Sequence, residues 1–453
     1  MNPLSLSQVA EMSGAMLLAG DPSAQALRIC KDTREIREGD LYVALRGENF
    51  DGNNFIAEAA SKGAIAALCD AEAPTGLPPG FGILSTPDAL AGLTLMASAW
   101  RSRLTLRPVV VTGSSGKTSV KDMTATVLAS KLRVTATKGN LNNQIGLPLS
   151  ILEADTSDEA AVWEIGMNHR GEIAPLAGLA RPEIGIITGI GSAHIEFLGS
   201  RAEIAREKGD LLERLPASGF GIIPSFDDFA AELKGRTSAR IIEVGFGQGD
   251  LRAIDLKPDL EGSSFVIEGD FGRAEARLPV LGRHMVGNAL LAVAAGTLCG
   301  ISLEECVGAL GKTSITGGRL ARHTMRGATI LDDTYNANPD SMVAALETLD
   351  SVRVKGRKIA VLGKMGELGD HAAAGYQRVG EKAAGIVDTL ICVGEEASAI
   401  ADAAVKAGHS GTQLASSNAM AAGILSRLLS PGDLVLLKAS RSGRMEQILQ
   451  HLT

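Results

Sequence analysis

The segment TGSSGKT at residues 112–118 is the strongest candidate for chemistry in this sequence. It follows the apolar run RPVVV and precedes a run with helical spacing, which predicts a loop between a strand and a helix. Glycines let such a loop curl so that backbone N–H groups and the helix N-terminus face phosphate oxygens. Lys117 would then reach the β- and γ-phosphates of a nucleotide, and Thr118 would offer its hydroxyl to Mg²⁺. The alternative is a Gly-rich turn without a ligand, but the strand–loop–helix context favours nucleotide binding.

One position of this loop departs from the common phosphate loop. Val111 stands where the longer form has a glycine, five residues before Gly116. The segment is therefore the shorter TGxxGKT form. This form indicates a narrower group of ligases rather than GTPases, kinases or motor ATPases.

Two polar residues near the ends of predicted strands are candidates for holding a metal ion. Glu164 ends the strand AVWE, and His194 lies shortly after the strand IGIITGI. Because open α/β sheets bind ligands at the carboxyl ends of their strands, both side chains are expected beside the phosphate loop. Carboxylate and neutral imidazole can both ligate Mg²⁺ or Mn²⁺, although His is less usual for Mg²⁺. Each residue could also be an ordinary polar loop residue.

The first two parts of the chain differ in their patterns. About the first 85 residues combine a helix at 4–17 with short apolar strands at 39–47 and 63–70, and a long amphipathic helix at 86–104 leads into the next part. The period-two pattern of 251–279 predicts antiparallel strands. Further strands alternate with helices, which indicates a parallel, doubly wound sheet; they lie at 107–113, 161–167, 184–190 and 220–224.

The last part forms a second α/β unit. Small residues at 314–318 (SITGG) mark a boundary before it. Apolar strands separated by helices follow, at 328–333, 357–363, 389–394 and 433–440. We therefore predict three domains, at residues 1–85, 86–314 and 315–453.

Composition limits the class of protein. A chain of 453 residues should hold roughly three domains, and 45% hydrophobic with 21% charged residues excludes a disordered chain. A net charge of −8, no basic cluster and only 3% aromatic residues disfavour nucleic-acid binding. The five dispersed cysteines, an N-terminus unlike a signal peptide and no apolar run of ~18 residues predict a cytoplasmic protein without a membrane span.

With these features together, the sequence resembles the Mur ligase family, the ATP-dependent amide-forming enzymes of bacterial peptidoglycan synthesis. The resemblance covers essentially the whole chain. Besides TGSSGKT, it rests on DTREIREGDLYVALRGENFDGNNF (32–55), KGNLNNQIGLPLSIL (138–152), WEIGMNHRGEI (163–173), GSAHIEFLGS (191–200), GRHMVGN (282–288), GGRL (317–320), LDDTYNANPDSM (331–342) and KASRSGRMEQIL (438–449).

The resemblance implies three α/β domains: a small N-terminal domain that binds a UDP substrate, a central domain with a phosphate loop and an ATPase-type parallel sheet, and a Rossmann-like C-terminal domain. LDDTYNANPDSM and NHRGEI are most similar to members that add D-Ala-D-Ala to UDP-MurNAc-tripeptide. In that reaction ATP converts the terminal carboxylate to an acyl phosphate, and the amine of D-Ala-D-Ala attacks it, releasing ADP and phosphate. Both steps crowd negative charge onto phosphoryl oxygens, so positioned cations should dominate catalysis.

The same resemblance implies roles for individual residues, with ATP and Mg²⁺ as cofactors and with a monomer that binds UDP-MurNAc-tripeptide and D-Ala-D-Ala. The implied catalytic residues are Lys117, Glu164, His194, Lys208 and Arg319. ATP would be bound by Gly113, Ser114, Ser115, Gly116, Lys117, Thr118, Asn288, Arg319 and Asp333. The metal would be held by Thr118, Glu164, His194 and Lys208, and the UDP moiety by Asp32, Thr33 and Arg34.

Three of these residues have an implied functional role and also a simpler structural explanation. Lys208 matches a lysine that some family members carry as a carbamate, but it could be an exposed helical lysine. Arg319 would reach the γ-phosphate, or could form an interdomain salt bridge; Asp333 would bind the ATP ribose, or could form a turn. Two positions depart from the family pattern: Met285, where a second Asn is common near the adenine, and Lys364, where an acid is commoner.

Two other functions stay open at this point. The first is a neighbouring ligase activity within the family, which adds the third amino acid of the peptide or polyglutamate to folate; LDDTYNANPDSM argues against it. The second is a nucleotide-binding protein without ligase chemistry, which the intact set of implied catalytic residues disfavours. The third residue of the peptide, lysine or diaminopimelate, is not disclosed by the sequence.

Overall fold

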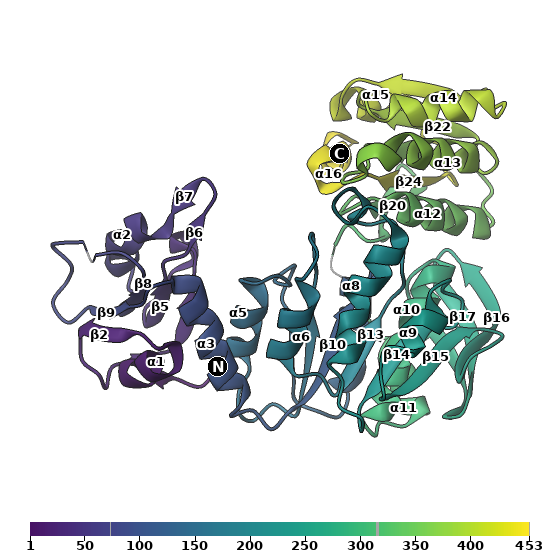
Figure 1. The fold of residues 1–453 in the computed structure, drawn as a ribbon. Coiled ribbons are helices and arrows are strands. Elements are labelled where there is room, and N and C mark those ends of the chain that lie inside the picture. The colour runs from purple at the N-terminus through teal and green to yellow at the C-terminus, as the bar shows by residue number, and fades with distance from the viewer. Residues whose placement is uncertain (73, 314–316, 453) are drawn as a thin grey trace. The chain divides into compact units, whose positions relative to one another are not determined.

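The computed structural model describes residues 1–453 apart from residue 73, residues 314–316 and residue 453. The chain forms two compact units (Figure 1). The first comprises Met1–Val110, Lys131–Gly166 and Glu172–Glu183, and the second comprises Val111–Ser130, Met167–Gly171 and Ile184–Thr453. Most of the predicted boundary at 314–318 lies outside the described residues.

The N-terminal part of the first unit is built on a five-stranded sheet in the order β2-β9-β8-β5-β4. Strand β2 is antiparallel to β9, and the other neighbours are parallel. Buried side chains from α2, β5, β8 and β9 form one hydrophobic core. The bounds are β2 (Met16–Ala19), β4 (Arg28–Cys30), β5 (Asp40–Val43), β8 (Ala66–Cys69), β9 (Gly82–Ser85), α1 (Leu6–Ser13), α2 (Ile56–Ser61) and α3 (Ala89–Arg101).

The predicted helix at 4–17 is too long. It ends at Ser13 because Gly14 takes a left-handed conformation with φ 68°, which terminates a helix. The apolar residues that follow form the edge strand β2 instead. Short paired segments complete this part: β1 (Leu4–Ser5) with β3 (Gln25–Ala26), and β6 (Arg46–Gly47) with β7 (Phe50–Asp51).

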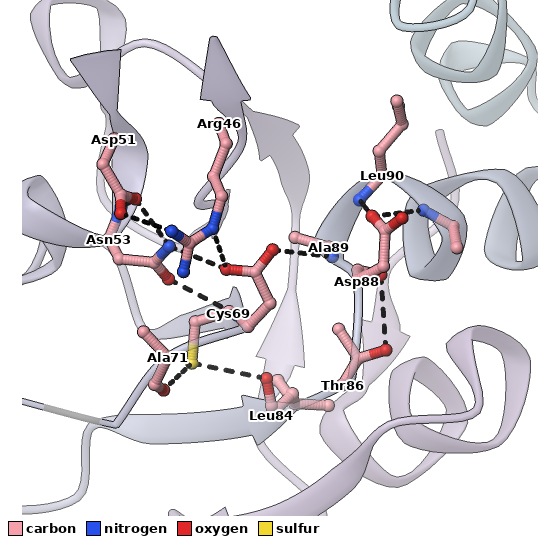
Figure 2. A network of polar contacts seen from close by, with 12 residues as sticks. Arg46, Asp51, Asn53, Cys69, Ala71, Leu84, Thr86, Asp88, Ala89 and Leu90 are labelled. Atoms are coloured by element: carbon pink, nitrogen blue, oxygen red, sulfur yellow. Dashed lines mark hydrogen bonds and ion pairs between the residues drawn. The ribbon is translucent and has the colours of Figure 1, made fainter. Parts of the chain in front are cut away.

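A polar network ties the β6–β7 hairpin to α3 (Figure 2). Its centre is Asp70, which follows β8 and has a side chain that is only 10% exposed. Arg46 Nε and Asn53 Nδ2 donate to Asp70 Oδ1 at 2.9 and 2.8 Å. The N–H of Ala89, the first residue of α3, lies 3.4 Å from Asp70 Oδ2. One carboxylate therefore serves three segments of the chain.

Replacing Asp70 with alanine is expected to lower the free energy of unfolding by about 1–3 kcal/mol, because Asn53 and Arg46 each lose one acceptor and keep only Asp51, and the N–H of Ala89 loses its contact. Burial raises the pKa of Asp70, but the donors from Asn53 and Arg46 outweigh it and hold the pKa below its ordinary value. The carboxylate therefore stabilises the fold above the ordinary pKa of Asp, and this stabilisation is lost as pH falls through the lowered value. Denaturant unfolding with hydrogen exchange of residues 46–53 measures both effects.

Asp21→Ala is the matched control for Asp70→Ala. Asp21 lies in an exposed turn, where its Oδ1 accepts from the N–H and the Oγ of Ser23. These two hydrogen bonds do not link it to another segment of the chain. Equal unfolding midpoints for Asp70→Ala and Asp21→Ala would contradict the structural role of Asp70.

The rest of the first unit contains strands that precede and follow the phosphate loop along the chain. Strand β12 (Ala160–Glu164) is parallel to β11 (Val134–Ala136) and lies between it and β10 (Arg107–Thr112). Every residue of β12 is buried. Helices α5 (Gly146–Glu153) and α6 (Ile173–Ala180) follow β11 and β12 in the chain.

The second unit begins within β10 and contains a parallel arrangement followed by an antiparallel meander. Strands β13, β14 and β15 are parallel, and α4 packs against α10. The prediction for 251–279 is confirmed, because β16, β17 and β18 pair in antiparallel fashion. The bounds are α4 (Lys117–Leu128), β13 (Ile184–Ile187), α7 (Ile195–Leu198), α8 (Arg201–Glu213), β14 (Phe220–Pro224), α9 (Ala230–Lys234), β15 (Arg240–Phe246), β16 (Leu251–Asp259), β17 (Gly262–Gly269), β18 (Gly272–Leu278), α10 (Arg283–Leu298) and α11 (Leu303–Leu310).

A six-stranded sheet in the order β19-β20-β24-β21-β22-β23 forms the C-terminal part. The four strands predicted there are present as β20, β21, β22 and β24, and the last of them lies between β20 and β21. The two edge strands β19 and β23 are missing from the prediction because their residues are largely exposed and polar. The bounds are β19 (Ala321–Met325), β20 (Ala328–Asp333), α12 (Pro339–Ser351), β21 (Lys358–Leu362), α13 (Ala372–Ala384), β22 (Thr389–Val393), α14 (Ser398–Lys406), β23 (Thr412–Ala415), α15 (Asn418–Leu428), β24 (Leu434–Lys438) and α16 (Glu446–Leu452).

Among the described residues, none of the helices has the length and apolar character that a membrane crossing requires. All five cysteines are free.

Candidate active site

The predicted phosphate loop joins β10 to α4 and is held by the residues that follow β13. The N–H of Thr188 donates to Thr112 O at 2.9 Å, which continues the pairing beyond the end of β13. Gly113 and Gly116 have φ angles of 147° and 85°, backbone conformations that residues with a side chain rarely adopt. A side chain at Gly113 would also collide with Thr188, and one at Gly116 would lie 2.8 Å from Asn288 Oδ1. The loop therefore requires both glycines.

Two cations converge on this loop. Lys117 begins α4, and its Nζ donates to Gly113 O at 2.9 Å, so the ammonium folds back over the loop. Thr118 is 8% exposed, and its Oγ1 accepts from Arg319 Nη2 at 3.2 Å. The Arg319 guanidinium also stacks on Tyr335, with its Cζ 3.8 Å from the ring centroid. The C-terminal part thus supplies an arginine to a loop that lies 201 residues earlier in the chain.

Asn338 provides a second link from the C-terminal part to the phosphate loop. Its Oδ1 caps α12 by accepting from the N–H of Ser341 at 2.8 Å. Its Nδ2 donates to Ser115 Oγ at 3.1 Å. The side chain is therefore held at both ends, between the start of a helix and the loop.

His194 lies in the loop after β13, immediately before α7, in a left-handed conformation with φ 64°. Its Nδ1 is 2.6 Å from Glu367 Oε2. This close contact with His194 lowers the pKa of Glu367 below its ordinary value, although burial opposes the shift. Glu367 comes from the C-terminal part, so this contact fixes the orientation of the imidazole from outside its own loop.

Lys208 lies on α8 and is completely buried, contrary to the alternative of an exposed helical lysine. Its Nζ has no hydrogen-bond partner among the residues that the structure describes. Burial, followed by the positive charge of Lys117, lowers the pKa of Lys208 well below its ordinary value, and Glu207 only partly opposes this. An uncharged amine is therefore favoured at this position.

Glu164 belongs to the first unit, where it ends β12 and is 1% exposed. Asn142 Nδ2 donates to Glu164 Oε1 at 2.7 Å, and the N–H of Glu164 donates to Thr137 Oγ1 at 3.0 Å. Its second oxygen, Oε2, has no hydrogen-bond partner within the described part of the chain. A buried carboxylate oxygen left in this way is suited to a cation.

The two residues with implied contacts to adenosine lie on different elements of the second unit. Asn288 is buried on α10, lies against Gly116 and donates to Met285 Sδ at 3.6 Å. Asp333 ends β20, and its Oδ2 is 2.6 Å from Nζ of the buried Lys438. Asp333 therefore has a structural partner and is more than a turn-forming residue.

The implied UDP segment lies in the first unit. Asp32 caps the short 3₁₀ helix at Thr33–Glu35 by accepting from the N–H of Arg34. The Arg34 guanidinium, whose side chain is 85% exposed, pairs with the Asp32 carboxylate at 2.5 Å. The hydrogen bond from the Arg34 side chain, only partly opposed by burial, lowers the pKa of Asp32 to about 2.

No group of three His, Cys, Asp or Glu side chains that could hold a metal ion occurs among the described residues. The residues that the resemblance implies for Mg²⁺ lie in both units, Glu164 in the first and Thr118, His194 and Lys208 in the second. Three of their atoms, Glu164 Oε2, His194 Nδ1 and Lys208 Nζ, are buried without hydrogen-bond partners in the described part of the structure, and His194 Nδ1 faces Glu367 Oε2 at 2.6 Å. A bare amine is a poor ligand for Mg²⁺, which prefers oxygen.

Comparison with known protein families decides the classification. The Mur ligase middle domain matches residues 111–296, and the glutamate ligase domain of Mur ligases matches residues 318–441. The chain belongs to the Mur ligase family. The catalytic domain of this family also matches residues 28–91. The resemblance from the sequence motifs is thus confirmed, as is the three-domain α/β fold of the family.

Relatives and solved structures of Mur ligases match nearly the whole chain. The UDP-N-acetylmuramoyl-tripeptide–D-alanyl-D-alanine ligase of Bacillus subtilis (strain 168) is 36% identical, over 94% of this chain and 92% of the relative. That of Escherichia coli (strain K12) is 33% identical, over 99% and 98%. A crystal structure of MurF from Acinetobacter baumannii has a TM-score of 0.91 at 31% identity, covering 100% and 99%. MurF ligase from Thermotoga maritima in complex with ADP has a TM-score of 0.84 at 28% identity, covering 94% and 97%.

Four residues of this Mur ligase make contacts that sequence reasoning did not assign. Asn338 donates to the phosphate loop, Glu367 contacts His194, and Lys438 pairs with Asp333. Asn142 donates to Glu164. Three of them lie in motifs quoted above, but a motif does not reveal its partner. Only Asn338 has a local signal, because an Asn before a proline is typical of a helix start.

Proposed function

We propose that this Mur ligase adds D-Ala-D-Ala to UDP-MurNAc-tripeptide, giving UDP-MurNAc-pentapeptide, ADP and phosphate. The observation that carries the proposal is the similarity over nearly the full length to ligases named for this reaction. The ADP complex of the Thermotoga maritima relative supports ATP as the phosphoryl donor.

The reaction needs activation because a carboxylate has no good leaving group. A carboxylate oxygen attacks the γ-phosphorus of ATP, ADP leaves, and an acyl phosphate forms. The amine then attacks the acyl carbon, loses a proton, and phosphate leaves with the electron pair of the broken C–O bond. In both steps we assign Lys117 and Arg319 to the phosphoryl oxygens, because both cations lie at the phosphate loop and the developing charge is negative.

We assign the Mg²⁺ site to Thr118, Glu164, His194 and Lys208. Glu164 Oε2 in the first unit and Lys208 Nζ in the second are each buried without a hydrogen-bond partner among the described residues, which supports a role for each of them. The ion, when bound, supplies positive charge that polarises phosphoryl oxygens. Glu367 would keep the His194 ring in one orientation through Nδ1 and leave Nε2 for the site.

The remaining roles concern recognition of the two nucleotides. The backbone and hydroxyls of Gly113, Ser114, Ser115 and Gly116 would hold the ATP phosphates. Asn288 is proposed to lie near the adenine. Asp333, which pairs with Lys438, is proposed to accept the ribose hydroxyls. Asp32, Thr33 and Arg34 are proposed to bind the UDP moiety. The domain limits 1–85, 86–314 and 315–453, the cytoplasmic location and the monomeric state stay predictions.

The choice of amine donor separates this function from its rivals. With UDP-MurNAc-tripeptide and ATP present, D-Ala-D-Ala should release ADP at least about 10²-fold faster than lysine, meso-diaminopimelate or glutamate. A coupled ADP assay measures this directly. Faster release with lysine or diaminopimelate and the matching dipeptide substrate would indicate the neighbouring ligase activity. Nucleotide binding without substrate-dependent release of ADP would indicate a non-catalytic protein.

A further inference from the structure

A carboxylate of the C-terminal part is docked on the loop that carries His194. Asp340 lies in the first turn of α12, and its Oδ2 accepts from both the N–H and the Oγ of Ser192, each at 2.8 Å. Its Oδ1 accepts from Arg378 Nη1 of α13 at 2.7 Å. Three donors therefore hold one carboxylate, and two of them belong to the loop after β13.

The loop is shaped to admit this carboxylate. A side chain at Gly191 would place its Cβ 2.6 Å from Asp340 Oδ2, closer than Cβ atoms are found. The absence of a side chain at Gly191 therefore lets Asp340 reach the N–H of Ser192. Burial raises the pKa of Asp340, but the bonds from Arg378 and Ser192 outweigh it and lower the pKa overall, so the carboxylate stays ionised.

The placement is unusual for a carboxylate because it lies near groups that are expected to meet phosphate. Asn338, two residues before Asp340, contacts Ser115 of the phosphate loop. A negative charge here would repel a triphosphate unless its charge is neutralised, and Arg378 supplies that neutralisation. Such a costly arrangement indicates a role in bringing the start of α12 onto this loop.

We infer that Asp340 is a positioning residue of the ligase reaction: it docks α12 on Gly191 and Ser192 and thereby sets Arg319 and His194 relative to the phosphate loop. The inference rests on the proposed function for its kinetic part only. Arg378 orients the carboxylate, and Gly191 provides the space for it. Asp340 itself contacts no reacting group.

The kinetic test compares Asp340→Ala with two other variants. A misplacement of about 1 Å at a reacting centre costs on the order of 10²-fold in rate, so Asp340→Ala should lower kcat by about that factor and change KM for the UDP substrate by less than about threefold. Gly191→Ala should have the same effect from the other side of the contact. Glu347→Ala is the matched control, because Glu347 joins the same two helices by an ion pair with Lys382 and should leave kcat unchanged.

A double variant and hydrogen exchange make the test specific. Gly191→Ala combined with Asp340→Ala should be no slower than either alone, because both remove one contact. In the full-length protein, the Ser192 amide should exchange about tenfold faster in Asp340→Ala, as expected for losing a hydrogen bond to a charged group, and not in Glu347→Ala. An unchanged exchange rate at Ser192, or kcat within twofold of wild type, would overturn the inference. Wild-type protein without ligase activity would overturn the proposed function, while the exchange result would still decide on the docking.

Discussion

Replacing Lys117 with alanine is expected to lower turnover by about 10²–10³-fold, the usual cost of losing one preorganised electrostatic contact. In the structure its ammonium folds over the phosphate loop and contacts Gly113 O, so its charge is placed for a bound phosphate. The Lys117 side chain is only half-buried at the start of α4, so the melting temperature should change little. The measurement is the ADP assay with all three substrates, together with thermal unfolding.

Lys234→Ala serves as the control for this charge removal. Lys234 is a half-exposed lysine of α9 that pairs with Glu243, and its loss should leave turnover unchanged. Turnover of Lys117→Ala within a few-fold of wild type would show that the phosphates are held by other groups.

Replacing Lys208 is expected to have the second largest effect, a loss of about 10²-fold in turnover. Burial and the charge of Lys117 favour the neutral amine of Lys208, and only a neutral amine adds to CO₂. The nitrogen bonds to the carbon of CO₂ and releases one proton, which turns an orphaned buried amine into an anionic oxygen ligand. Such a carbamate would add an anionic oxygen ligand to the proposed Mg²⁺ site.

Two variants distinguish a carbamate from a packing role. Lys208→Ala should regain part of its activity with added short-chain carboxylic acids, because they can occupy the space left by the side chain. Lys208→Met fills that space and should not be rescued. Independently of activity, protein exchanged with ¹³CO₂ should show a carbamate carbon resonance that Lys208→Met lacks. Near-normal turnover of Lys208→Ala, or no such resonance in the active protein, would refute the role.

The sequence by itself determined those features that depend on neighbouring residues. The phosphate loop is one of them, since β10, the glycines and α4 are contiguous and the positive φ angles of Gly113 and Gly116 are ones that glycine permits. Strands with continuous apolar residues, such as β21 and β24, were also predictable because burial on both faces leaves a plain pattern. Edge strands such as β2 and β23 were not, because exposed side chains remove that pattern.

Only the tertiary structure decided how distant segments meet. Arg319 reaches Thr118 across 201 residues, and Asp340 reaches Ser192 across 148. Glu367 reaches His194 from the loop after β21. No local propensity encodes these contacts, because they depend on how the C-terminal sheet packs and on which helix start it presents. The burial of Lys208 is of the same kind, since α8 gives it no special sequence signal and the surrounding elements alone remove it from water.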